Sequence, residues 1–146
     1  KYNYCYDVLI YPQHLTETLH FVSKFANQKF VIDHAAKPAI AKGEWKKWSE
    51  EITMLAQHPQ VYCKLSGLFT EAKWNQWKQQ DFYPYLDTLF ETFGANRLMF
   101  GSDWPVINTA GNYNEWLQLL QQYMQQLPEK DISKIMGENA IHFYAL

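Results

Sequence analysis

The chain has 146 residues, of which 47% are hydrophobic and 17% aromatic, which excludes a disordered polypeptide and predicts one domain over residues 1–146. Its 13 basic and 15 acidic residues give a net charge of −2 without a basic stripe, so we expect no nucleic-acid partner. Its longest apolar runs are far shorter than a bilayer crossing, so we expect no membrane partner.

Four short apolar runs, at residues 6–11, 30–33, 61–65 and 97–101, alternate with amphipathic segments. The apolar residues of these segments recur at helical spacing: Leu15, Leu19, Val22, Phe25; Trp45, Trp48, Ile52, Leu55; Phe82, Tyr85, Leu86, Leu89, Phe93; Tyr113, Trp116, Leu117, Leu120 and Met124. This alternation predicts βα units and a parallel sheet, an α/β fold. After Pro128, two short helical pieces are expected, separated by a left-handed cap at Gly137.

Four βα units fit either an open doubly wound sheet or half of a (β/α)8 barrel, which as a whole has about 250 residues. A nucleotide-binding open sheet is expected to carry a glycine-rich turn after its first strand. Here the first strand is followed by Tyr11-Pro12-Gln13-His14. The half-barrel is favoured because polar groups directly follow three successive apolar runs.

Those polar groups are Asp33-His34, Lys64-Leu-Ser66-Gly67 and Gly101-Ser-Asp103-Trp-Pro105. In parallel α/β folds, active sites form at the carboxyl ends of the strands. Asp103 either accepts backbone hydrogen bonds in a tight turn before Pro105, or acts as a general base or metal ligand. His34 is either a satisfied core or loop residue, or a metal ligand or hydrogen-bond donor to a polarised carbonyl.

Lys64 interrupts an otherwise apolar strand, so it needs a partner or must face the mouth of a barrel. Two readings are equally supported: an ion pair with Asp33, or a cation that anchors substrate. The connection over residues 66–80 is long, and Phe69, Trp74 and Trp77 within it suit a lid. The alternative is a short amphipathic helix that packs on the rim.

Cys5 and Cys63 each fall inside an apparent strand, and neither belongs to a CxxC pair. A disulfide scaffold needs more cysteines at regular spacings. We therefore predict two buried free thiols in a reducing compartment, and so a cytoplasmic protein.

Four ordered motifs carry a resemblance to a known family. They are Phe-Val-Ile-Asp-His-Ala-Ala-Lys-Pro at 30–38, Val-Tyr-Cys-Lys-Leu-Ser-Gly at 61–67 with Thr-Glu-Ala at 70–72, Arg-Leu-Met-Phe-Gly-Ser-Asp-Trp-Pro at 97–105, and Asn-Ala-Ile-His-Phe-Tyr at 139–144. Together they resemble the amidohydrolase-2 family of TIM-barrel, metal-dependent hydrolases. Within that family the chain is most similar to sugar lactonases, the fuconolactonases and rhamnonolactonases.

The resemblance implies the C-terminal half of a distorted TIM barrel, strands five to eight. It implies that Asp103 is the last-strand aspartate that activates water and that His34 is the strand-six site histidine, with both as tentative metal ligands. Lys64 and Ser66 match a motif near the site and, with Trp74 and Trp104, are the expected substrate-binding residues. The expected reaction is the attack of water on a lactone carbonyl, which opens the ring of a sugar-acid or related lactone.

Two departures bear on the cofactor. Relatives carry an HxH pair on the first strand, and this chain begins after it; residues 7–11 also lack the strand-five histidine of many amidohydrolases. No HxH or HExxH occurs in the chain. A divalent metal such as zinc and metal-free catalysis therefore both remain open.

Two alternative functions also remain open: an amidohydrolase-type decarboxylase, and a non-catalytic half-barrel that serves in assembly or binding. A half-barrel exposes sheet edges, so we expect self-association or pairing with an N-terminal half. We expect the isolated chain to be inactive, because the missing strands would supply site groups.

Overall fold

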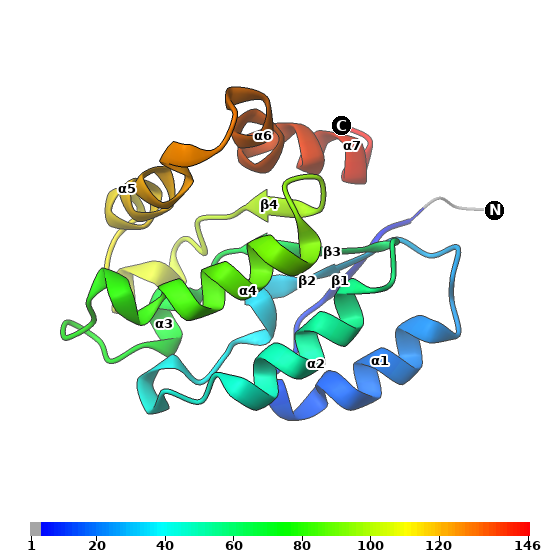
Figure 1. Ribbon diagram of the computed structural model, residues 1–146, viewed down its shortest axis with the longest axis horizontal. Helices are drawn as coiled ribbons and strands as arrows, with labels where there is room; N and C mark the ends of the chain where they lie inside the picture. The colour runs from blue at the N-terminus through cyan, green and yellow to red at the C-terminus, as the bar shows by residue number, and fades with distance from the viewer. Residues whose placement is uncertain (1–3) are drawn as a thin grey trace.

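The computed structural model describes residues 4–146 and contains one four-stranded parallel sheet in the order β1-β2-β3-β4 (Figure 1). The strands are β1 (Tyr6–Val8), β2 (Phe30–Ile32), β3 (Val61–Leu65) and β4 (Leu98–Phe100). Asp7 aligns with Val31 and Tyr62 across the first three strands, and Lys64 aligns with Met99. The predicted α/β parallel sheet is therefore confirmed; β3 matches the apolar run that predicted it, and the other three strands are shorter than theirs.

A long helix follows each strand. After each of the first three strands, this helix returns the chain to the amino ends of the parallel strands. The long helices are α1 (Leu15–Ser23), α2 (Lys46–Ala56), α4 (Tyr83–Phe93) and α5 (Tyr113–Tyr123). The shorter ones are α3 (Leu68–Glu71), α6 (Glu129–Ser133) and α7 (Asn139–Tyr144), with 3-10 turns η1 (Pro12–His14), η2 (Asp33–Ala36), η3 (Ile40–Lys42), η4 (Gln79–Asp81), η5 (Val106–Thr109) and η6 (Met124–Gln126). Figure 1 shows α1, α2 and α4 along one side of the sheet and α7 on the other side.

The two faces of the sheet bury different clusters. On β3, Val61, Cys63 and Leu65 are buried and Tyr62 and Lys64 are half-buried, as alternation along a strand requires. The first set belongs to the main core beneath the helices. The opposite face forms a smaller cluster in which Phe143 of α7 packs with residues of β2 and β4. Helix α7 therefore covers part of the face that would point into a barrel.

Among the described residues, β1 and β4 each pair with a single neighbouring strand. A closed barrel has no such edges, because each strand pairs on both sides. Four parallel strands with helices outside and two unpaired edges form the geometry expected of half a (β/α)8 barrel.

The C-terminal segment differs from its prediction. Gly137 lies inside a π-helical turn, η7 (Lys134–Glu138), that joins α6 to α7 without a break. The left-handed position is at Ala145, after α7. The Asn139 amide donates to the carbonyls of Ala95 and Leu98, both at 2.7 Å, and this anchor fixes the helix beside β4.

The thiol prediction is confirmed in part. Cys5 and Cys63 are both free, and Cys63 is buried in β3. Cys5 precedes β1 and is half-buried; its thiol donates to the carbonyl of Phe143 at 2.9 Å. None of the helices formed by residues 4–146 combines the length and apolar character that a bilayer crossing requires.

Candidate active site

A left-handed turn directly after β2 delivers His34. Four consecutive residues, 34–37, have φ between 50° and 58°. This conformation costs roughly 1–2 kcal/mol for each residue that is not glycine, so neighbouring contacts must hold it. The indole N–H of Trp48 on α2 donates to the carbonyl of Ala35 at 2.8 Å, and the Lys37 N–H donates to the carbonyl of His34 at 2.7 Å.

An ion pair braces the end of the same turn. Lys37 Nζ lies 2.9 Å from Glu71 Oε1, and both side chains are mostly buried. Lys37 follows β2 and Glu71 follows β3, so the pair ties together two adjacent loops at the rim. The sequence motifs contained both residues, but their opposite charges alone did not indicate that they meet.

His34, Ser66 and Asp103 converge at the carboxyl ends of β2, β3 and β4. The Nδ1 atom of His34 lies 2.8 Å from the hydroxyl oxygen of Ser66. Its Nε2 atom lies 3.5 Å from Oδ1 of Asp103. The imidazole therefore bridges a buried hydroxyl and a carboxylate contributed by two other strands.

Burial determines the charge state of His34. Burial of the imidazole lowers the pKa of His34, and the nearby carboxylates of Asp103 and Asp33 only partly oppose this effect. Because the ordinary histidine pKa is about 6.5, the ring is neutral at pH 7. A neutral imidazole has one donor and one acceptor nitrogen, so it can ligate a metal or donate one hydrogen bond.

Asp103 has the features of a reactive carboxylate. Its side chain is only 9% exposed, and its backbone adopts φ 57°. Its Oδ2 atom is buried and has no hydrogen-bond partner among residues 4–146. A buried carboxylate oxygen without a partner is costly, so it calls for a water, a substrate proton or a metal.

Lys64 forms the ion pair with Asp33 that one reading predicted, at 2.7 Å. Its ammonium also lies 2.7 Å from Asp7 Oδ2, and the hydroxyl of Tyr144 donates to the same carboxylate. Burial disfavours the charged form of Lys64, but hydrogen bonds with Asp33, Asp7 and Tyr144 outweigh this and raise its pKa. The ammonium is thus shared by two carboxylates, and its role toward substrate stays a prediction.

The tryptophans proposed for substrate are exposed at the rim. Trp104 is 69% exposed and Trp74 is 52% exposed. In contrast, Phe69 is buried and stacks on Trp77 at 4.2 Å between ring centroids, and the Trp77 indole donates to the carbonyl of Ala110. Residues 68–71 form α3. The loop is therefore pinned by Phe69 and Trp77, as in the rim-packing alternative.

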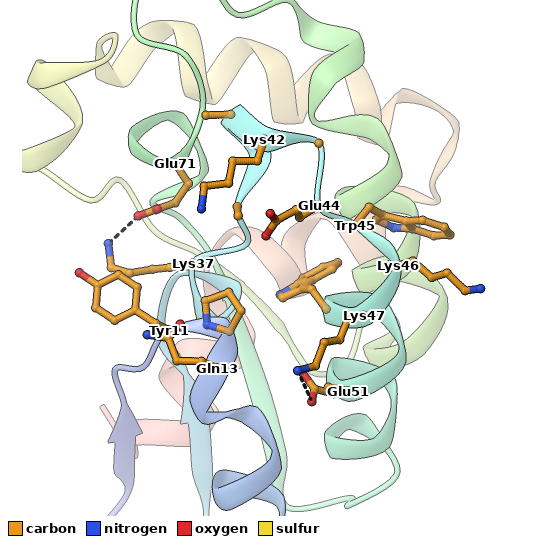
Figure 2. A pocket seen from close by; sticks show the side chains of 15 residues that line it. Tyr11, Gln13, Lys37, Lys42, Glu44, Trp45, Lys46, Lys47, Glu51 and Glu71 are labelled. Carbon is orange, nitrogen blue, oxygen red and sulfur yellow. Dashed lines mark hydrogen bonds and ion pairs between the residues drawn. The ribbon is translucent and has the colours of Figure 1, made fainter.

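A cleft of about 780 Å³ is lined by Lys37 and Glu71, among others, but not by His34 or Asp103. Figure 2 shows its walls: Lys37 and Glu71 face each other with Tyr11 alongside, and Lys47 approaches Glu51 on another side. The lining comes from η1, the loop after β2, the start of α2 and Glu71. The cleft therefore adjoins the left-handed turn, outside the three-strand rim.

The residues fit a metal only as part of a ligand set. Zinc sites in proteins use three or four nitrogen, sulfur or oxygen ligands. His34 and Asp103 supply two, and residues 4–146 contain no group of three histidine, cysteine or acidic side chains placed to hold an ion. Further ligands would have to come from outside the described residues.

The parallel sheet, its outer helices and the polar rim define a protein of the TIM-barrel class, represented here by half of its strands. The chain belongs to the amidohydrolase family, which matches residues 10–146. This confirms the family to which the motifs were assigned.

Three curated relatives have sugar-lactonase names, and two of them illustrate the range. The chain is 40% identical to an L-fucono-1,5-lactonase of Burkholderia ambifaria over 97% of this chain and 50% of that protein. It is 27% identical to an L-rhamnono-gamma-lactonase of Scheffersomyces stipitis over 88% of this chain and 44% of that protein.

A solved structure supports the same fold. The crystal structure of an amidohydrolase from Burkholderia multivorans with bound zinc is 37% identical and superposes with a TM-score of 0.92 over 98% of this chain and 53% of that one. The chain thus spans about half the length of the relatives it matches. This coverage confirms the half-barrel.

Proposed function

We propose that this chain supplies half of the active site of a hydrolase that opens sugar-acid lactones, with Asp103 as the general base. The observation that carries the proposal is the 3.5 Å approach of His34 Nε2 to Asp103 Oδ1 at one rim, where Asp103 Oδ2 is buried without a hydrogen-bond partner among residues 4–146. The lactonase names of two relatives support the substrate class.

The reaction needs a base for water and a group that stabilises the developing oxyanion. Asp103 Oδ2 accepts a proton from water as the water oxygen attacks the lactone carbonyl carbon. The neutral His34 ring donates Nε2–H toward charge that develops at this rim. The ring C–O bond then breaks, the leaving alkoxide takes up the proton, and the product is a hydroxy acid.

A divalent metal such as zinc is compatible with this proposal but not required by it. His34 and Asp103 would be two of its ligands, and the bound ion would supply Lewis-acid polarisation of the carbonyl. The zinc in the Burkholderia multivorans structure supports this version. The alternative is metal-free activation of water by Asp103, whose Oδ2 atom is buried without a hydrogen-bond partner among residues 4–146.

The substrate-binding roles of Lys64, Ser66, Trp74 and Trp104 are part of the proposal to different degrees. The exposed indoles of Trp74 and Trp104 offer apolar area and are open to a sugar-derived ring. Lys64 is proposed to contact a polar group of the substrate with its ammonium, whose charge the carboxylates of Asp7 and Asp33 already neutralise. Ser66 is buried, and its hydroxyl oxygen lies 2.8 Å from Nδ1 of His34.

The remaining strands of the barrel are proposed to pair with β1 and β4. Apolar side chains are exposed near both edges of the sheet: Tyr6, Leu9 and Tyr11 beside β1, and Trp104 and Val106 after β4. Such side chains and unpaired edges fit a partner that continues the sheet. The greater length of the relatives supports an additional half of the same fold. The free thiols support a reducing compartment such as the cytoplasm.

The experiment uses the complete protein, meaning this chain together with the strands that close its barrel. It is incubated with a panel of sugar-acid lactones, and acid release and product mass are measured with and without added Zn²⁺. Ring opening with one added water supports the proposal. Release of carbon dioxide would identify a decarboxylase instead, and no turnover of any lactone would contradict the proposed function.

A further inference from the structure

We propose that Ser66 is a positioning residue: its hydroxyl donates to Nδ1 of His34 and thereby holds the ring with Nε2–H directed at Asp103. This assigns Ser66 to the imidazole and not to the substrate. The inference belongs to the metal-free version of the proposed site, because a metal bound to Nε2 would replace its proton. The kinetic part of the test rests on the proposed lactone hydrolysis, whereas the spectroscopic part does not.

The contact has the features of a built hydrogen bond. The Ser66 hydroxyl oxygen lies 2.8 Å from Nδ1 of His34, and Ser66 is 2% exposed. Buried hydroxyl groups in folded proteins have a partner, and an unpaired one is destabilising. Because substrate would have to displace the imidazole to reach this hydroxyl, a direct contact with substrate is disfavoured.

The direction of the hydrogen bond follows from the opposite side of the ring. A carboxylate has only acceptor sites, and Asp103 Oδ1 lies 3.5 Å from Nε2. A proton on Nε2 is therefore attracted to the carboxylate, whereas a lone pair there would be repelled. A neutral imidazole carries one N–H, so Nδ1 is left as the acceptor and Ser66 must donate.

Two glycines make room for this arrangement. A Cβ atom on Gly67 would lie 2.7 Å from Cβ and Cγ of His34 and 2.8 Å from Nδ1. A Cβ atom on Gly101 would lie 3.0 Å from Cβ of Ser66 and 3.2 Å from its hydroxyl oxygen. The close approach of three loops, each from a different strand, thus depends on backbone without side chains.

The test is the tautomer of His34, measured by NMR of the ring nitrogens in the complete protein labelled with ¹⁵N-histidine. A His34→Gln sample identifies the His34 signals. We expect wild type to show a single tautomer with the proton on Nε2, and Ser66→Ala to show shifted ring-nitrogen signals and a mixture of tautomers. Ser66→Thr, which keeps the hydroxyl, is expected to restore the wild-type pattern.

His14 supplies an internal reference. The backbone N–H of Tyr11 donates to Nδ1 of His14 at 3.3 Å, so the ring of His14 has a partner other than Ser66. Its signals should be identical in all samples. A wild-type His34 that carries its proton on Nδ1 would overturn the proposal without any variant, and so would unchanged His34 signals in Ser66→Ala.

Kinetics then separate positioning from a purely structural role. Ser66→Ala should lower kcat for lactone hydrolysis by roughly 10–100-fold with little change in KM, and Ser66→Thr should recover most of it. Unchanged kcat together with an altered tautomer would refute the positioning role. If the complete protein hydrolyses no lactone, the proposed function fails, while the NMR result still decides the role of Ser66.

Discussion

The Nε2 atom of His34 lies 3.5 Å from Oδ1 of Asp103, although the two residues follow different strands of the sheet. Strand β3 lies between them in the sheet order, and its Ser66 contacts the same ring from the other side. The pair therefore exists only because three parallel strands end at one rim. The sequence predicted both His34 and Asp103 as site residues, because each follows an apolar run.

A side chain added at position 67 should displace the His34 ring. In Gly67→Ala, the new Cβ would meet the imidazole, so we expect lactonase activity to fall by at least about tenfold. Gly43→Ala is the matched control, because Gly43 has the same φ of 67° but nothing lies within 4 Å of its added Cβ. Both variants should lose about 1 kcal/mol of unfolding free energy through backbone strain. Equal activity in the two variants would contradict the tight seat for His34.

Trp48→Phe should lower the free energy of unfolding, because the Trp48 indole holds the left-handed turn after β2. Phenylalanine keeps most of the buried ring but removes the indole N–H, which leaves the Ala35 carbonyl unpaired. We expect a loss of about 1–3 kcal/mol in unfolding free energy, measured by urea denaturation. Trp45→Phe is the comparison, because Trp45 is partly exposed and water can replace its hydrogen bonds. A loss as small as that of Trp45→Phe would show that Trp48 does not hold the turn.

Lys64→Met should be destabilising, because the Lys64 ammonium is shared by two carboxylates at the rim. The substitution leaves the carboxylates of Asp7 and Asp33 facing each other without a cation. We expect a loss of about 1–3 kcal/mol in unfolding free energy, less than for a fully buried pair because these side chains are partly exposed. Lys134→Met removes a peripheral pair with Asp131 and should cost less than about 1 kcal/mol. The reverse order would count against the rim network.

The lowered pKa of His34 predicts a pH dependence of stability. Below the ordinary pKa of about 6.5, the unfolded chain binds a proton at this residue before the folded chain does. The contribution of His34 is therefore fully present above about pH 6.5 and declines as pH falls toward the lowered value. The free energy of unfolding, measured between pH 5 and 8, should fall less steeply toward low pH in His34→Asn than in wild type. The two slopes should differ by at most about 1.4 kcal/mol per pH unit. Parallel curves would contradict a neutral, buried ring.

The periodicity of the sequence predicted the parallel sheet and the positions of its strands, because βα alternation leaves few other topologies. The residues after those strands predicted the rim, since parallel strands bring their carboxyl ends together. Four βα units also fit an open sheet, but the polar residues after three successive apolar runs favoured the half-barrel, and the family resemblance then indicated the same architecture.

Other features depend on tertiary contacts that have no local signature. The second carboxylate on Lys64, from Asp7, requires the register of β1 against β2 and β3. The Lys37–Glu71 pair requires the left-handed turn at residues 34–37. None of these residues is a glycine, so the sequence gives no signal for the turn. Gly137 was expected to end a helix, but the Asn139 anchor and a π-helical turn carry the helix through it.

Asp103 is proposed to activate water at this rim. Its most direct test is kcat for lactone hydrolysis in the complete protein, compared between wild type, Asp103→Asn and the control Asp131→Asn, whose carboxylate pairs with Lys134 at 2.9 Å. We expect kcat to fall roughly 10²–10⁴-fold in Asp103→Asn and to stay unchanged in Asp131→Asn. Wild-type turnover by Asp103→Asn would contradict it.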